Sequence, residues 1–158
     1  MPTGFIPHDH KACIRTGVAQ AESLCREGGL KLTPVRRRVL ELLLAEHRAM
    51  GAYEILDRLR DEGLGSQPPV AYRALDFLVA NGLAHKVERL NAFIACTHIG
   101  DAHTPAFLIC RACHRVVETA SSLPRAALTE TAEGLGFTVE RAAVEAEGLC
   151  PACRDAGA

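Results

Sequence analysis

The sequence predicts an α+β protein with a helical first part that ends in a β-hairpin and a second part that mixes strands with one helix. Three observations predict this fold class. The spacing of apolar residues changes from a helical period to a strand period after Asn81-Gly82, glycines and prolines divide the chain into short elements, and two Cys-x-x-Cys motifs follow in the second part. With 158 residues, 48% of them hydrophobic, the chain can form one mid-sized domain or two small ones with apolar cores.

Four helices are predicted in the first part. Their ends are marked by an N-cap, by prolines at first helical positions and by glycines after last positions, at Gly28-Gly29, Thr33-Pro34, Gly63, Pro68-Pro69 and Asn81-Gly82. The predicted helices are Val18–Glu27, Thr33 to about His47, Ala52–Arg60 and 68–80. The last helix has one apolar face, which leaves Tyr72 and Arg73 pointing away from the core.

Two strands follow the fourth helix. Leu83, His85 and Val87 alternate with their neighbours, and a second strand, Ala92–Cys96, follows a turn near residues 89–91. Helices followed by a β-hairpin are typical of a winged-helix DNA-binding domain, in which the helix before the hairpin enters the major groove. We therefore expect this domain at residues 1–96 and a hinge at 97–105.

The second part, residues 106–158, is expected to be an α/β domain. Its predicted elements are a strand at Ala106–Ile109, a short strand at Val116–Glu118, a helix from Ser122 to about Leu135 and a last strand at Phe137–Ala146. The two Cys-x-x-Cys motifs lie after the first and the last of these strands.

These two motifs predict a closed structural zinc site. Cys110, Cys113, Cys150 and Cys153 form two knuckles separated by 36 residues, and four thiolates complete a tetrahedral zinc shell. The alternative is a redox dithiol of the thioredoxin kind, which needs only one Cys-x-x-Cys. A four-thiolate zinc leaves no open coordination position, so this site is expected to stabilise the fold and not to catalyse.

A second, looser group of possible metal ligands consists of His85, Cys96, His103 and Glu118. A two-residue turn at 89–90 or 90–91 pairs His85 with Ile94 or with Cys96, and in both registers His85 and Cys96 share one face of the hairpin. A three-residue turn would place them on opposite faces. Taken one by one, these residues have ordinary alternatives: a core histidine, a small buried hydrophobe and a solvated carboxylate.

Composition limits the possible functions. The net charge is −1, although residues 1–95 carry 13 basic and 11 acidic side chains and residues 96–158 carry 5 and 8, which permits a DNA-facing first part. No signal peptide and no membrane-spanning run is predicted, so we expect a cytoplasmic protein with reduced cysteines. We find no nucleophile with a partnering base and no phosphate-binding glycine loop, so an enzyme is not expected.

The order of motifs resembles the ferric uptake regulator family, and most closely its zinc uptake regulator branch. The resemblance covers the chain from about Ala19 to Cys153. It rests on five motifs in order: Thr33-Pro34 before an arginine-bearing helix, residues 52–56, Pro68-Pro69 with residues 72–78, residues 85–88 and the paired knuckles. It implies a zinc-responsive repressor of zinc uptake genes that binds a palindromic operator as a homodimer. It also implies two zinc ions per chain, with residues 106–158 as the dimerisation domain.

Residue roles are implied by the same resemblance. His85, Cys96, His103 and Glu118 correspond to the regulatory zinc ligands, with His98 as a rival to His103. Arginine pairs with guanine, so Arg73 is expected to read a base, and the resemblance adds Tyr53 as a second base contact. Phosphate contacts are expected from Arg36, Arg37, Arg38 and Lys86. Each of these roles has an alternative: Arg73 could form an ion pair with Asp76, Tyr53 could pack as an ordinary aromatic residue, and the arginines of the second helix could be a solvated face. Asp57 and Arg60 are candidates for linking neighbouring dimers on DNA.

Two alternatives to a zinc-responsive repressor stay open. One is an iron- or peroxide-responsive regulator of the same family, although those branches carry a His-x-His stretch where this chain has Thr104, Pro105, Ala106 and Phe107. The other is a zinc-ribbon enzyme or thiol oxidoreductase. The chain also lacks the family's usual threonine before Tyr72, so Ser66 or Gln67 is expected to cap the helix that begins at Pro68.

Overall fold

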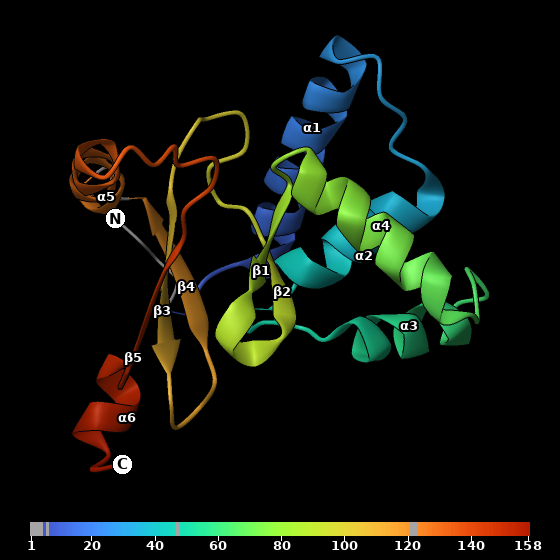
Figure 1. Cartoon of the computed structure of the whole chain (residues 1–158). Helices are drawn as coiled ribbons and strands as arrows, with labels where there is room; N and C mark the ends of the chain where they lie inside the picture. The colour runs from blue at the N-terminus through green and yellow to red at the C-terminus, as the bar shows by residue number, and fades with distance from the viewer. Residues whose placement is uncertain (1–4, 6, 47, 121–122) are drawn as a thin grey trace.

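The computed structural model describes residues 5, 7–46, 48–120 and 123–158 (Figure 1). Along the chain the elements are α1 His10–Glu27, α2 Pro34–Leu44, α3 Ala52–Asp61, α4 Pro68–Ala80, β1 Ala84–Val87, the 3-10 turn η1 Glu88–Leu90, β2 Ala92–Ala95, β3 Pro105–Cys110, β4 Val116–Ala120, α5 Leu123–Gly134, β5 Val144–Gly148 and α6 Pro151–Asp155. The α+β class is confirmed.

Helices α1 to α4 and the hairpin β1–β2 form the winged-helix domain. Helix α4 packs against α2 and α3, and α1 packs against α2. Leu40, Ile55 and Leu75 are fully buried where these helices meet. The predicted N-cap of α2 is present, since the Thr33 hydroxyl accepts a hydrogen bond from the backbone N–H of Arg36 at 3.3 Å.

Helix α1 begins at His10, eight residues before the predicted start at Val18. The Asp9 carboxylate caps this earlier start by accepting the backbone N–H of Lys11 at 2.9 Å. Gly17 lies inside the helix and is buried; a Cβ atom there would come within 2.7 Å of the Leu44 side chain. This glycine therefore allows α1 and α2 to pack closely and does not break the helix.

The prediction for the C-terminal end of the chain was partly wrong. Strand β5 begins at Val144 and not at Phe137, because the chain pairs with β3 only from Val144 onward, and Phe137 is 65% exposed. The short helix α6 was not predicted; it begins at Pro151, directly after Cys150. The predicted helix ends at His47 and Ser122 lie outside the described residues.

The C-terminal domain is built on a three-stranded sheet with the order β4-β3-β5. Strand β3 is antiparallel to β4 and parallel to β5, so Glu118, Phe107 and Glu145 lie side by side in one row across the sheet. The hairpin β1–β2 lies between this sheet and the helices, as Figure 1 shows. A second apolar cluster joins the hairpin to the sheet and contains Val87, Ile94, Phe107, Ile109 and Val116.

We predict that Thr33→Ala destabilises the winged-helix domain by about 1 kcal/mol, because it removes the side-chain oxygen that caps α2. The midpoint of chemical unfolding followed by circular dichroism measures this change. Thr33→Ser, which keeps the oxygen, should unfold near the wild-type midpoint. Equal losses in the two variants would assign the effect to the missing methyl group.

Candidate metal and DNA-binding sites

The hairpin places His85 and Cys96 on the same face. His85 pairs with Ile94, which is one of the two predicted registers, and the Cys96 N–H donates to the Leu83 carbonyl at 3.0 Å. The connection spans residues 88–91 and is therefore longer than the predicted two-residue turn. It ends at Asn91 in the left-handed conformation, with φ 46°. The even number of turn residues preserves the face assignment.

The structure brings the four predicted donors of the second group together, and we call them the sensor cluster: His85, Cys96, His103 and Glu118. Their ligand atoms all lie within 4.8 Å of one another. His103 Nε2 is 3.3 Å from His85 Nε2 and 3.7 Å from Cys96 Sγ. Glu118 Oε1 lies 2.7 Å from His103 Nε2 and 3.0 Å from His85 Nε2. The cluster joins the hairpin to the sheet, since Glu118 comes from β4.

Neighbouring groups orient these ligands. His103 Nδ1 donates to the Asp101 carbonyl at 2.7 Å, which turns Nε2 toward the cluster. The second oxygen of Glu118 accepts the Thr97 N–H at 2.9 Å and the Thr97 hydroxyl at 3.2 Å. Sequence reasoning did not identify Thr97, because a threonine after a strand carries no metal-site signal.

His98 lies at the edge of the sensor cluster. Its Nδ1 is 3.8 Å from Glu118 Oε1, and it contacts the Thr97 hydroxyl at 3.0 Å. His98 is 32% exposed and His103 is 12% exposed. The group of mutually close donors contains His103, not His98.

Burial and charge shift the protonation of the cluster. Burial opposes ionisation of Glu118, but hydrogen bonds from His85, Thr97 and His103 outweigh it and hold the pKa of this carboxyl at about 2. Burial, reinforced by the charge of Glu118, raises the pKa of the Cys96 thiol to about 12. The pKa of His103 is also raised: burial opposes this, and the hydrogen bonds to Asp101 and Glu118 prevail. Without a metal the cluster therefore keeps the Cys96 thiol protonated and favours the protonated form of His103.

The sensor cluster fits a zinc ion. Zinc bonds of roughly 2.0 to 2.3 Å in tetrahedral geometry separate neighbouring ligand atoms by about 3.3 to 3.8 Å. The separations of 3.3 Å and 3.7 Å among the two histidines and Cys96 match this range, whereas Glu118 Oε1 lies at hydrogen-bonding distance from both histidines, at 2.7 Å and 3.0 Å. One thiolate, two imidazoles and one carboxylate are also the donor types that zinc takes.

The four knuckle cysteines also converge, with their sulfur atoms within 4.8 Å of one another. Cys113 Sγ is 3.8 Å from Cys150 Sγ, and the Cys150 N–H donates to Cys110 Sγ at 3.4 Å. Backbone N–H groups of Cys113 and Cys150 lower the pKa of the Cys110 thiol to about 6. Hydrogen bonding with Cys150 raises the pKa of Cys153 to about 12. The site lies where β3 and β5 end, because parallel strands bring their ends to the same edge.

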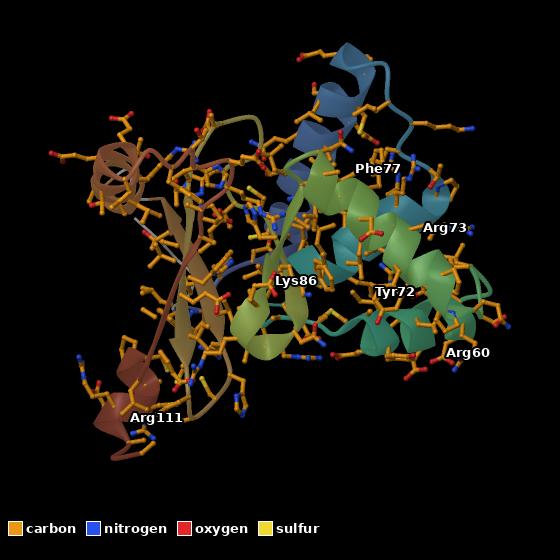
Figure 2. All side chains as sticks on the ribbon, in the orientation of Figure 1. Arg60, Tyr72, Arg73, Phe77, Lys86 and Arg111 are labelled. Atoms are coloured by element: carbon orange, nitrogen blue, oxygen red, sulfur yellow. The ribbon has the colours of Figure 1, made fainter. Side chains whose placement is uncertain are left out.

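The candidate DNA-reading side chains point away from the core. Arg73 is exposed on α4, and Tyr53 on α3 is 65% exposed. Figure 2 shows Arg73 and Tyr72 projecting from α4. Among the described residues no carboxylate forms an ion pair with Arg73, so the alternative pairing with Asp76 is absent from the structure. Helix α4 has Gln67 as its N-cap, and no side chain caps it.

The other candidate DNA contacts are engaged within the chain. The Arg36 guanidinium lies 3.8 Å over the Phe77 ring and donates to the Lys31 carbonyl at 2.6 Å. Arg37 pairs with Glu22, and Arg38 bonds Glu62 and Glu41. Lys86 lies 3.6 Å from Glu88. These pairs are partly exposed and therefore weak, so they do not prevent a contact with a phosphate.

Asp57 and Arg60 form an exposed ion pair of 3.0 Å on α3. Both side chains are more than half exposed, at 67% and 52%.

No described helix is long and apolar enough to cross a membrane.

Comparison with known proteins identifies the family. The model of the ferric uptake regulator family matches residues 27–147. The zinc uptake regulation protein of Escherichia coli (strain K12) is 40% identical over 138 residues, which cover 86% of this chain and 80% of that protein. A solved zinc uptake regulator complexed with zinc and DNA has a TM-score of 0.87 at 36% identity, covering 91% of this chain and 97% of the other.

Two states of one relative differ in their likeness to this structure. Holo XcZur, 43% identical, has a TM-score of 0.81 and covers 87% of this chain and 96% of its own. Apo XcZur, at the same 43% identity and with 90% and 99% covered, has a TM-score of 0.52. Because the identity is equal, the difference lies in the arrangement of the chain and not in its sequence. With most of its length matched by the family model and by a relative at 40% identity, the chain belongs to the ferric uptake regulator family.

Proposed function

We propose that this protein is a zinc-responsive transcriptional repressor of zinc uptake genes, and that it binds a palindromic operator as a homodimer. The observation that carries the proposal is the position of the sensor cluster. His85 and Cys96 belong to the hairpin of the winged-helix domain, whereas Glu118 belongs to the sheet of the other domain. A metal bound by all four residues favours the one arrangement that brings them together.

Zinc at this cluster would supply a doubly charged centre that displaces the proton of the Cys96 thiol and disfavours protonation of His103. His103 and Glu118, which precede and belong to the sheet, then bind the same ion as His85 and Cys96 of the hairpin. This contact fixes the orientation of the winged-helix domain relative to the C-terminal domain. In a dimer, that orientation sets the distance between the two α4 helices and therefore their fit to two half-sites. The greater likeness to holo than to apo XcZur supports this arrangement as the metal-bound one.

The donor types favour zinc over iron or manganese. The thiolate of Cys96 is a soft ligand, and soft ligands disfavour metals that prefer oxygen and nitrogen. Zinc named in the structure of a similar regulator supports the same metal.

We further propose that each chain binds two zinc ions with different roles. The knuckle site would carry four thiolate charges and leave no ligand position open, which suits permanent binding. The sensor cluster carries two ligand charges, from Cys96 and Glu118, which offset the charge of the ion. The sensor site should therefore bind more weakly and exchange faster.

On the DNA side we propose that Arg73 and Tyr53 contact bases and that Arg36, Arg37 and Lys86 contact phosphates. The role of Arg73 is supported by two observations: its side chain is exposed on α4, and it forms no ion pair with another described residue. Arg37 would share or exchange its pairing with Glu22 when a phosphate approaches. Asp57 and Arg60 would link neighbouring dimers by exchanging their present ion pair for one between chains.

We expect metal analysis to find two zinc ions per chain, of which mild chelation removes one and leaves a folded dimer. Cys110→Ser should lose the zinc of the knuckle site, and the C-terminal domain should unfold, because structural zinc in small domains contributes ~10–16 kcal/mol of binding free energy to folding. Cys13→Ser, a cysteine outside both ligand sets, is the control. A stable zinc-free dimer from Cys110→Ser would contradict the structural role.

The central test is Cys96→Ser. Replacing the thiolate should weaken zinc binding at the sensor cluster by more than about 100-fold, since losing even an outer-shell partner costs 10- to 100-fold. The knuckle zinc and the circular dichroism spectrum should not change. We would titrate wild type and variant, at low and saturating free zinc, with a duplex selected by the wild type from a random pool.

The variant should lose the zinc-dependent gain in DNA affinity, because that gain equals the coupling free energy between the two ligands. A Cys96→Ser protein that keeps the full gain would show that Cys96 only packs in the core. A wild type without any zinc-dependent gain would refute the proposed function itself.

We predict that Arg73→Ala lowers affinity for the selected duplex by about 1–3 kcal/mol for each base it contacts, while affinity for random DNA changes little. Parallel titrations on both duplexes measure the difference. Arg141→Ala, an exposed arginine of the C-terminal domain, controls for the loss of one positive charge. Equal weakening on both duplexes would make Arg73 a phosphate contact.

A further inference from the structure

The sheet of the C-terminal domain presents two carboxylates to the hairpin, one on each side of Phe107. In the strand register Phe107 is paired with Glu118 on β4 and with Glu145 on β5. Paired residues of neighbouring strands project from the same face of a sheet. The Phe107 side chain between them is 1% exposed and packs against Val87 and Ile94 of the hairpin.

These two carboxylates hold opposite ends of the hairpin. Glu118 meets His85 and Cys96 at the end that belongs to the sensor cluster. Glu145 meets the turn: its Oε1 accepts the Glu88 N–H at 2.6 Å, and its Oε2 accepts the Arg89 N–H at 3.0 Å. Only the first of these contacts lies at a metal site.

The contact at the turn is of a strong type. Both oxygens of Glu145 are used, each accepting a backbone N–H of η1 in a charge-assisted hydrogen bond. Glu147 adds a bidentate ion pair with Arg89, in which Nε and Nη2 of the arginine donate to the two carboxylate oxygens at 2.7 Å and 3.1 Å. These contacts all lie at the exposed surface, but the Arg89–Glu147 pair must order two long side chains, whereas Glu145 bonds backbone groups of the turn, so Glu145 makes the larger contribution.

We infer that Glu145 is a positioning residue that holds the hairpin against the sheet without metal and thereby raises the zinc affinity of the sensor cluster. The inference rests on the proposed function. When only a fraction of the molecules is in the competent arrangement, the apparent affinity for a ligand is the intrinsic affinity multiplied by that fraction. Contacts of Glu145 with the turn exist only when the domains are together, so they increase the fraction in which His85 and Cys96 already face Glu118.

Glu145→Ala tests this inference in the full-length dimer with its knuckle zinc. Without DNA, the zinc concentration that half-fills the sensor cluster should rise about fivefold to tenfold, as expected for two charge-assisted hydrogen bonds at a partly exposed site. In titrations with the selected duplex the zinc midpoint should rise by a similar factor. At saturating zinc the DNA affinity should return to within about twofold of wild type, because metal binding then compensates for the lost contact.

Two variants serve as controls. Glu140→Ala removes the same charge from an exposed position of the same domain, and no described residue forms an ion pair or hydrogen bond with Glu140. It should leave the midpoint unchanged. Glu147→Ala removes only the screened pair and should shift the midpoint by less than Glu145→Ala. Thermal unfolding of the C-terminal domain should be the same in all these proteins.

The outcomes separate this inference from the proposed function. If wild type responds to zinc and Glu145→Ala has the wild-type midpoint, or shifts it no more than Glu140→Ala does, then Glu145 does not position the hairpin. A DNA affinity that stays low at saturating zinc would mean that Glu145 acts on the DNA interface, and this result also overturns the inference. A wild type that ignores zinc would refute the proposed function instead.

Discussion

The buried carboxylate of Glu118 constrains the arrangement of the two domains. Its side chain is fully buried and ionised, and a buried charge without partners is strongly unfavourable. Several of its partners come from outside its own sheet: His85 from β1, and Thr97 from the segment after β2. Separation of the domains would remove these partners and require water to replace them. The domain arrangement is thus tied to the chemistry of one side chain.

The two ligand sets divide stability from response by their position in the fold. The knuckles lie at the ends of β3 and β5 and connect segments of a single domain, so a metal there acts on folding. The sensor cluster instead connects the two domains, beside the apolar cluster that joins the hairpin to the sheet. A metal there changes the relative population of the domain arrangements, while the core of the helices stays intact.

Sequence reasoning predicted most of the helices, the hairpin and the four knuckle cysteines because each rests on local chemistry: caps, periodicity and cysteine spacing. It missed what depends on tertiary pairing. Strand β5 begins only where β3 offers a partner, and α1 starts at the Asp9 cap and includes Gly17, where close packing against Leu44 suits a glycine. The grouping of His103 and Glu118 with the hairpin came from family resemblance, since residues in different elements carry no common spacing. Thr97 and Glu145 act through contacts that only the folded chain reveals.

Strand β2 explains how the sensor cluster can act on the DNA-binding helices. All four of its residues are buried, because the strand is covered on both faces. Phe93 and Ala95 belong to the core of the helices, whereas Ile94 packs with Phe107 of the sheet and Cys96, on the same face, enters the sensor cluster. Close-packed side chains do not slide independently. A contact made at Cys96 therefore moves the strand together with α2, which packs against β2 and in turn against α4.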